Sequence, residues 1–393
     1  MIEQSVCGSG VLVLREIPGC PGKAIDEGSP VTVFTDPLPA NTVMVVHGPE
    51  IFDSGEVAWL QATVKPSRTI VAGVMARTAA EESHLPVEFC GKPPSEILRM
   101  TPGAVFLANR GKTARSGRIF GEIVASRLAE RGLVYLECSS RTIFCWNRGD
   151  RMLATTLAHQ TGYEVADGTA TGYPGAVVPE IQKTREIRGC IPGESVYVNG
   201  IIIGRATAGT VVVRWNGVQV EAVSGLVPKP HGIEKLSRAG CVDIATAWCK
   251  SGSIRMAGAK TAGHAPGTGR VLVIDHCGHE FYARMPDDCC GVLAIGDDTT
   301  AVCGHISLHR GIPVLGIVDG DQDLIVPSVF ARGSVVVETI AERDDDVGAE
   351  LSRRVPLHQV QWAAWVEEML RHLQGRVRIV RDVRDDGDAM HPV

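Results

Sequence analysis

The stretch GVLAIGDDTTAVCGHISLHRGIPVLGIVDGDQD, residues 291–323, contains two short apolar runs, each followed by aspartates. The runs VLAI and PVLGIV do not alternate apolar with polar residues, which is typical of parallel strands buried on both faces. The segment 299–311 between them fits a helix. The stretch therefore predicts a strand–helix–strand unit that places its acids where two strands end.

Apolar runs separated by amphipathic segments also occur on both sides of this stretch. In the first part of the chain, apolar runs lie at 42–46, 68–74, 104–108 and 133–137, and amphipathic segments such as 116–132 and 151–162 separate them. Near the carboxyl end, further strands are expected at 270–275 and 334–338, with helices at 279–285 and 358–375. Residues 186–228 differ, because short β-rich runs are divided by Gly and Asn-Gly turns.

We therefore predict an α/β protein with two Rossmann-like, doubly wound parallel-sheet domains and a small antiparallel β module between them. The expected divisions are an irregular leader at 1–40, an N-terminal domain at 41–180, the β module at 181–240, a second α/β domain at 241–340, and a C-terminal helix and tail at 341–393.

Composition limits the class of protein. The 393 residues suit two or three domains, and 44% hydrophobic with 21% charged residues is typical of a globular chain. No apolar run approaches the ~18 residues of a membrane span, and the start of the chain lacks the features of a signal peptide, so we expect a cytoplasmic protein without a membrane partner. The formal charge of -6 argues against a protein that coats nucleic acid, although a local basic groove is still compatible with it. The twelve cysteines include no C-x-x-C pair, which favours reduced thiols over a disulfide framework.

The aspartates are the first candidates for a site. Asp297 and Asp298 follow one strand, and Asp319, Asp321 and Asp323 follow the next. If those strands are neighbours, about 4.8 Å apart, the carboxylates converge on one edge, which is unfavourable unless a cation neutralises them. Hard oxygen ligands favour Mg²⁺, Mn²⁺ or Ca²⁺, of which Mg²⁺ is the one that usually also binds a phosphate. The alternative is that Asp297 or Asp298 caps a helix and the others lie in solvated turns.

Candidate substrate ligands lie at both sheets. Thr299 and Thr300 open a helix whose free N–H groups could receive an anion. Arg77, Arg110 and Lys112 follow strand ends in the first domain and suit a phosphate or carboxylate, with solvated surface positions as the alternative. The stretch NRGKTARSG lacks the earlier glycine of a phosphate-binding P-loop, so that motif is rejected.

His47 and Glu50 follow the first strand of the N-terminal domain and are the candidates for a catalytic acid or base. A histidine that only packs or caps is the competing interpretation of His47. A zinc site is a separate hypothesis, because imidazole and thiol groups occur on two neighbouring elements. Its ligands would come from the set His276, Cys277, His279, Cys303, His305 and His309.

Three stretches carry a resemblance to a known family. VVHGPEIFDSGE (45–56), AGVMARTAAEES (72–83) and IGDDTTAVCGHISLHRGIPVLGIVDGDQD (295–323) resemble an archaeal, mainly methanogen, family of uncharacterised proteins, over about residues 42–340. The resemblance implies a cytoplasmic protein of a strict anaerobe, which suits free cysteines. It implies no established activity.

Residues 270–323 are also similar in layout to a Toprim domain, in which one strand ends in Glu and a later strand ends in Asp-x-Asp, the acids holding Mg²⁺. Asp319-Gly320-Asp321 matches the later element, whereas the first strand ends in Asp275-His276 instead of Glu. The resemblance implies nucleic-acid processing.

These observations lead to three hypotheses on function. The first is an Mg²⁺-dependent enzyme that acts on a phosphorylated small molecule or nucleotide. The second is a sensor that binds a nucleotide or metabolite without turnover. The third is Toprim-like nucleic-acid processing, which requires a basic groove beside Asp319 and Asp321.

Overall fold

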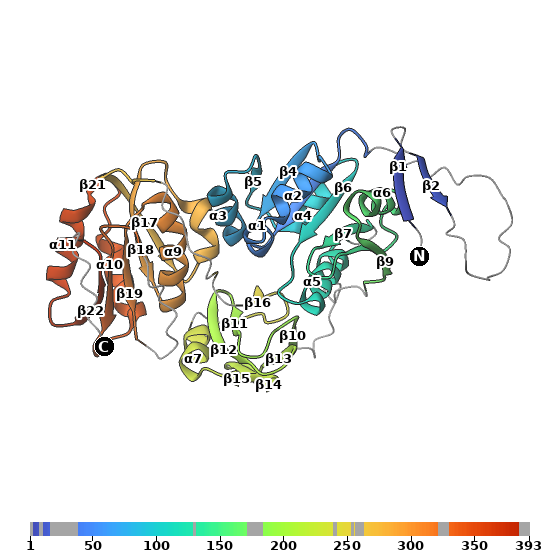
Figure 1. Cartoon of the computed structure of the whole chain (residues 1–393). Helices are drawn as coiled ribbons and strands as arrows, with labels where there is room; N and C mark the ends of the chain where they lie inside the picture. The colour runs from blue at the N-terminus through green and yellow to red at the C-terminus, as the bar shows by residue number, and fades with distance from the viewer. Residues whose placement is uncertain are drawn as a thin grey trace.

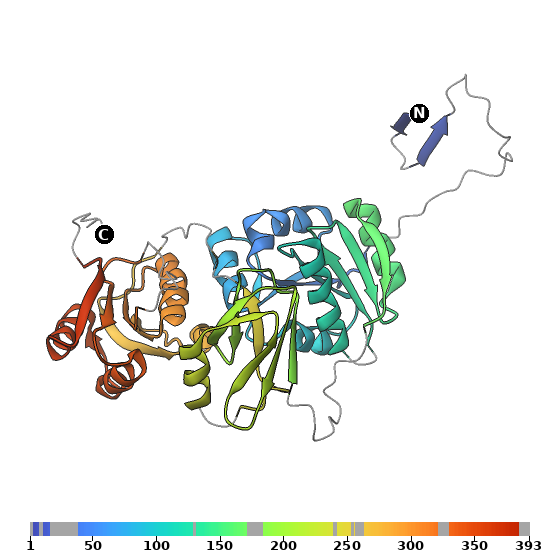
Figure 2. The ribbon, with the colours of Figure 1, turned by 90° about the horizontal axis from the view of Figure 1, so that it is seen from below.

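The computed structural model describes residues 3–7, 11–15, 38–128, 131–170, 184–238, 242–252, 255, 263–320 and 330–384. Two α/β units lie side by side, and a β module lies against both of them at their junction (Figures 1 and 2). We call these the N-terminal unit (38–170), the module (184–252) and the C-terminal unit (263–384). The fold class predicted from the sequence is confirmed. Within the described residues, no helix has the length and apolar character needed to cross a membrane.

The N-terminal unit is built on a seven-stranded sheet in the order β5-β4-β3-β6-β7-β8-β9. Its strand pairs are parallel except for β7 with β8. Because the order reverses between β3 and β6, their carboxyl ends form the switch point at which open α/β sheets bind ligands. The strands are β3 (Val43–His47), β4 (Arg68–Ala72), β5 (Glu88–Cys90), β6 (Val105–Asn109), β7 (Leu133–Glu137), β8 (Thr142–Trp146) and β9 (Glu164–Gly168).

Helices cover both faces of this sheet, as the apolar runs without alternation predicted. The helix expected at 116–132 begins earlier, at Ala114, because Thr113 and Ser116 form a capping box, and it ends at Ser126. The helices are α1 (Glu50–Asp53), α2 (Glu56–Thr63), α3 (Val74–Ser83), α4 (Pro94–Met100), α5 (Ala114–Ser126) and α6 (Arg151–Thr161).

The module consists of two small antiparallel sheets around one apolar core. Helix α7 (Pro230–Arg238), which is absent from the predicted elements, packs on it, and its Gly232 lies against the backbone of Ile202. One sheet contains β10 (Thr184–Arg188), β13 (Thr210–Trp215) and β14 (Val220–Ser224). The other contains β15 (Leu226–Pro228), β12 (Ile201–Ala206), β11 (Ser195–Val198) and β16 (Cys249–Gly252), so a strand beyond the expected end of the module at 240 completes it.

The C-terminal unit has a six-stranded sheet in the order β21-β17-β18-β19-β20-β22, with four parallel strands between two antiparallel edge strands. Every residue of β18 and β19 is buried, as the two apolar runs predicted. The strands are β17 (Thr268–Asp275), β18 (Cys289–Ile295), β19 (Val314–Val318), β20 (Val335–Thr339), β21 (Val360–Gln361) and β22 (Val377–Asp382).

Helical elements sandwich this sheet. On one face lie η1 (Gly278–Glu280), α8 (Phe281–Arg284) and α9 (Asp297–Arg310), and on the other lie α10 (Asp344–Arg354) and α11 (Trp362–His372). The helix expected at 358–375 is shorter, because residues 360–361 pair with β17. Helix α10 is not among the predicted helices, because the acids of its first turn indicate only a charged patch when read alone. In the leader, predicted to be irregular, β1 (Glu3–Cys7) pairs with β2 (Val11–Arg15).

Charged contacts join the two α/β units. Glu81 of α3 accepts hydrogen bonds from Arg77 at 3.0 Å and from Arg310 of α9 at 2.6 and 3.0 Å. Both guanidinium groups lie over the ring of Tyr282, at 4.0 and 5.3 Å from its centroid. Arg255 forms a second connection, because it pairs with carboxylates of α1 and α3 and contacts His305 of α9.

The packing of β18 against α11 generates a first prediction. A methyl group on Gly291 would lie 2.0 Å from Cε3 of Trp362, so Gly291→Ala overpacks the core. We expect the substitution to lower the free energy of unfolding by about 1–3 kcal/mol, measured by urea denaturation. Gly267→Ala, where no atom lies within 4 Å of the added methyl, is the matched control. Equal stability of the two variants would contradict this packing.

Candidate functional site

The carboxyl ends of the parallel strands of the C-terminal unit form one polar edge. In the sheet, Asp275 is in register with Ile295, and Ile295 with Ile317, so the residues after these strands are brought to the same level. Asp297 and Asp319 each lie two residues beyond a strand position in that register. Asp297, Asp298 and Asp319 border one cavity, but among the described residues the ligand atoms that lie close to Asp319 come from His231 and Asp344. A shared cation site of the two aspartate groups stays a prediction. Asp321 and Asp323 lie outside the described residues.

Gly296 links β18 to α9 and shapes this edge. It is the N-cap of α9 and has a φ of 99°, which favours glycine, and an added Cβ would lie 2.7 Å from Nε2 of His276. Asp297 and Asp298 are in the first turn of the helix, where their charge interacts favourably with the helix dipole. The alternative that one of them is the N-cap is wrong, because the cap is a glycine without a side chain.

The two threonines predicted to bind substrate are buried. Thr300 is fully buried, and its hydroxyl lies 3.5 Å from the carbonyl oxygen of Ala294. Its methyl group lies where a side chain on Gly316 would lie, so the two residues pack α9 onto β19. Thr299 is 4% exposed but borders the cavity described below. Of the pair, Thr299 alone is placed at the edge of that cavity.

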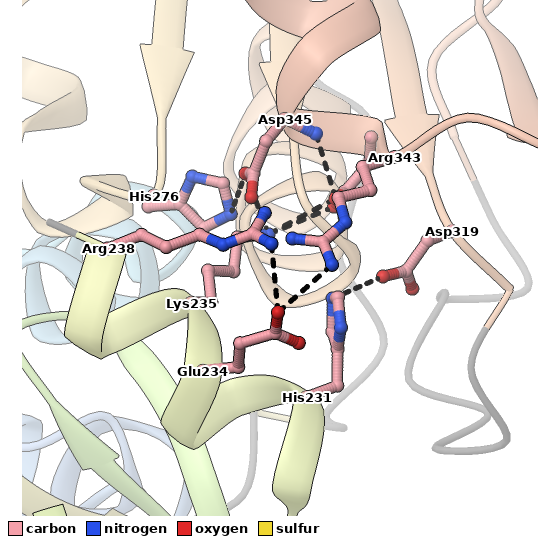
Figure 3. Close-up of polar contacts among 9 residues, drawn as sticks. His231, Glu234, Lys235, Arg238, His276, Asp319, Arg343 and Asp345 are labelled. Atoms are coloured by element: carbon pink, nitrogen blue, oxygen red, sulfur yellow. Dashed lines mark hydrogen bonds and ion pairs between the residues drawn. The ribbon is translucent and has the colours of Figure 1, made fainter. Parts of the chain in front are cut away.

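Two further elements complete the site (Figure 3). Helix α7 of the module extends His231 and Lys235 toward the C-terminal unit, and α10 begins there with Asp344 and Asp345. Nζ of Lys235 lies 3.2 Å from both carboxylate oxygens of Asp344 and 2.9 Å from Asp345. Nε2 of His231 lies 2.9 Å from Oδ2 of Asp319. The module therefore contacts the acidic edge through a lysine and a histidine.

The donor atoms form two groups among the described residues. His231, Asp319 and Asp344 each offer one ligand atom, and these atoms lie within 4.8 Å of one another. Asp275, His276 and Asp345 form the other group. A cavity of about 30 Å³ lies at this junction, enough for an ion or a water molecule, since one water needs roughly 10–15 Å³. The cavity is lined by Gly200, Ile201, Ile202, Lys229, His231, Gly232, Lys235, His276, Gly296, Asp297, Asp298, Thr299, Asp319 and Asp344.

The carboxylates crowded at this edge shift the pKa values of Asp344 and Lys235. Burial raises the pKa of Asp344, the charge of Lys235 opposes that shift, and Asp319 and Asp345 add to it, so the net pKa is above its usual value. Burial alone would lower the pKa of Lys235, but Asp344 and Asp345 outweigh it and raise the pKa. The lysine thus neutralises part of the edge, and further positive charge there would be stabilised.

At the other sheet, His47 ends β3 at the switch point. Its ring stacks on Phe120 at 4.7 Å between centroids. Burial, and then the charge of Lys250, lower the pKa of His47 to about 4, while a hydrogen bond with Asn109 opposes the shift. The imidazole is therefore neutral at pH 7. Glu50 opens helix α1 just beyond it.

The predicted basic ligands of the N-terminal unit have protein partners. Arg110 forms an ion pair with Glu56 at 2.6 Å, and Lys112 pairs with Glu194 of the module. Arg77 joins the contact between the α/β units through Glu81. Each of these three cations thus pairs with a glutamate, and its role in substrate binding stays a prediction.

The residues considered as zinc ligands make separate contacts in different parts of the structure. Nε2 of His305 lies 3.2 Å from Arg255, and His279 stacks on Trp248 at 5.5 Å. Cys303 is fully buried, and burial raises the pKa of its thiol. In the part of the chain that the structure describes, neither group of ligand atoms includes a cysteine, His279 or His305.

Sequence reasoning missed His231, Lys235, Asp344 and Asp345. The stretch PHGIEKLSR, 230–238, contains a usable signal, because Pro at the first helical position and apolar residues at 233 and 236 indicate a short amphipathic helix. His231 and Lys235 then share one face, four residues apart. The acids that follow β20 are a first-turn signature of a helix.

A family model described as "Uncharacterized protein conserved in archaea (DUF2117)" matches residues 44–359. The chain belongs to this family. It is 30% identical, over 337 residues, to the "Uncharacterized protein MJ0065" of Methanocaldococcus jannaschii, covering 80% of this chain and 92% of that protein. No solved structure matches.

The resemblance that three stretches carried is thereby confirmed, whereas the Toprim-like layout is not confirmed. The residues of the candidate site on α7, β19 and α10 all lie inside the matched region of this DUF2117 chain.

The buried pair of Lys235 and Asp344 generates a second prediction. Their side chains are 12% and 1% exposed, so Lys235→Met leaves a carboxylate without its cation, and we expect a loss of about 3 kcal/mol in the free energy of unfolding. Removing the lysine raises the pKa of Asp344 further. A folded-state pKa above the unfolded value means that stability falls as pH rises, so the loss should be larger at pH 8 than at pH 5.

Urea denaturation at both pH values measures this effect. The double variant Lys235→Met/Asp344→Asn removes the carboxylate charge and should recover much of the loss. A pH-independent loss that the second substitution does not reduce would show that the pair does not determine stability here.

Proposed function

We propose that this protein is a divalent-cation-dependent enzyme acting on a phosphorylated small molecule or nucleotide, with His231, Asp319 and Asp344 as the cation ligands. The observation that carries the proposal is the convergence of one imidazole nitrogen and two carboxylates within 4.8 Å, beside a cavity of about 30 Å³. The three residues come from different elements, α7, the end of β19 and the start of α10, so no local turn accounts for their approach.

The types of ligand atom limit which cations would bind at this site. Carboxylates suit Mg²⁺ and Mn²⁺, whereas imidazole suits Zn²⁺ and other transition metals. The aspartates alone favour Mg²⁺, Mn²⁺ or Ca²⁺, and the histidine from the module adds Zn²⁺ as a candidate. Three protein ligands leave coordination positions for oxygens of a substrate, which the cation would polarise.

A phosphorylated substrate is favoured by the position of α9. This helix of 14 residues begins at the cavity, and its first turn supplies N–H groups and the positive end of the helix dipole. A cation held beside it would bridge the aspartates to a phosphate. The neutral His47 and the adjacent Glu50 are the candidates for proton transfer at the opposite sheet edge, 47–50.

Calorimetric titration tests the cation site. Wild-type protein is titrated with Mg²⁺, Mn²⁺ and Zn²⁺ beside Asp319→Asn and His231→Gln. Each substitution removes one ligand, and we expect affinity to fall by about 100-fold or more, since even outer-shell partners contribute about 10–100-fold. Asp167→Asn, an exposed aspartate of β9, is the control and should bind like wild type. Equal affinity in the wild type, both site variants and the control would refute the site.

Turnover then separates an enzyme from a sensor. With the preferred cation present, a panel of nucleotides and phosphorylated metabolites is screened by thermal unfolding, where a ligand at 100 times its Kd stabilises by about 2.7 kcal/mol. Stabilising compounds are incubated and analysed for products. An enzyme should convert at least one of them and lose turnover in Asp319→Asn. Binding without any product would support the sensor hypothesis instead.

A further inference from the structure

Lys250 occupies an unusual position on β16. This strand pairs with β11, and the Lys250 ammonium lies 4.9 Å from the ring centroid of Tyr197 and 5.5 Å from that of Trp248. Two aromatic faces hold a cation while leaving its remaining N–H donors available. Among the residues that the structure describes, no carboxylate forms an ion pair or hydrogen bond with this ammonium, unlike Lys112 and Lys235.

Groups from all three parts of the protein surround this lysine. Burial lowers the pKa of Lys250 first, and repulsion from Lys112 of the N-terminal unit adds to it. Opposing attractions come from Asp298 of the C-terminal unit, Glu50 of the N-terminal unit and Glu194 of the module. Although neighbouring groups crowd the ammonium, the residue as a whole is exposed to solvent. Contacts beside Lys250 reach both α/β units, because Trp248 stacks on His279 of the C-terminal unit, and Glu194, which bonds Ser251, pairs with Lys112 of the N-terminal unit. Lys250 therefore lies where the module meets the two α/β units.

Lys250 interacts with groups at both sheet edges. Asp298 lines the cavity at the cation site and also interacts with Lys250. On the other side, Lys250 interacts with His47, which ends β3 at the switch point of the N-terminal sheet. A molecule that reaches from the proposed cation toward the N-terminal unit would therefore pass the ammonium of Lys250.

We propose that Lys250 binds a phosphate group of the substrate between the two α/β units. This inference rests on the proposed function for the class of substrate, although its geometry is independent of the cation ligands. Lysine is a common phosphate ligand and acts as a compact point charge. An anion placed here would stabilise the charged form of Lys250 against burial and against the repulsion from Lys112.

Pyridoxal 5′-phosphate is the probe, because it combines a phosphate with an amine-reactive aldehyde. The unprotonated amine adds to the carbonyl carbon, water leaves, and borohydride delivers hydride to the resulting C=N bond, which fixes the label as a secondary amine. Peptide mapping by mass spectrometry then quantifies each lysine. All labelling is done in chelator, so that no cation takes part.

We expect Lys250 to be labelled faster than Lys92, an exposed lysine of the N-terminal unit. Pyrophosphate should slow labelling of Lys250 about 10-fold and leave Lys92 unchanged, since a bound anion both covers the amine and raises its pKa. Succinate, a carboxylate of similar charge, should protect less. Lys250→Gln should weaken pyrophosphate binding about 10-fold by calorimetry, with Lys250→Arg retaining most of it and Lys92→Gln all of it.

Equal labelling of the two lysines, or no protection by pyrophosphate, would overturn the assignment of Lys250. The thermal midpoint of each variant is compared with wild type, so that an unfolded variant is recognised, and the labelling of wild-type protein decides the matter without any variant. Failure of cation binding by His231, Asp319 and Asp344 with protection retained would refute the cation site alone.

Discussion

The crowding of carboxylates at the carboxyl edge of the C-terminal sheet is the constraint on which the arrangement of this protein depends. Parallel strands in register bring Asp297 and Asp319 to one level just beyond Asp275, and α10 adds the buried Asp344. Like charges so close together are tolerated only with positive charge beside them. Lys235 of the module supplies part of this positive charge. The carboxylates at this edge of the sheet are therefore stabilised by the docking of the module.

The module is tied to both α/β units by the same kind of contact. Lys235 connects it to the C-terminal unit, and Arg188 reaches Glu122 of α5 in the N-terminal unit with two hydrogen bonds of 2.9 and 3.0 Å. Glu81 and Arg310 join the α/β units directly. These contacts hold the module and the two α/β units against one another.

Much of the fold follows from local patterns. Apolar runs such as residues 291–295 and 314–318 must be buried on both faces, so parallel strands and their helical covers are predictable from the amino-acid sequence. The placement of Asp297 and Asp319 at one edge of the sheet follows from the same pattern, since acids placed just beyond neighbouring parallel strands share an edge. Helix limits were less predictable, because a capping box at Thr113 and an edge pairing at 360–361 shifted them.

Periodicity along the chain specifies the two α/β units, the β module and one acidic edge, because it records which side of each element is buried. The cations that meet those acids are set by tertiary packing alone. Lys235 is 109 residues away from Asp344, and His231 belongs to a helix of another sheet system. Periodicity carries no information on which exposed face docks on which edge, since that depends on shape and charge complementarity between distant segments. The same reason explains why Lys250 is inconspicuous in the sequence: its importance comes from Tyr197, Lys112 and Asp298, which lie together only in the folded chain.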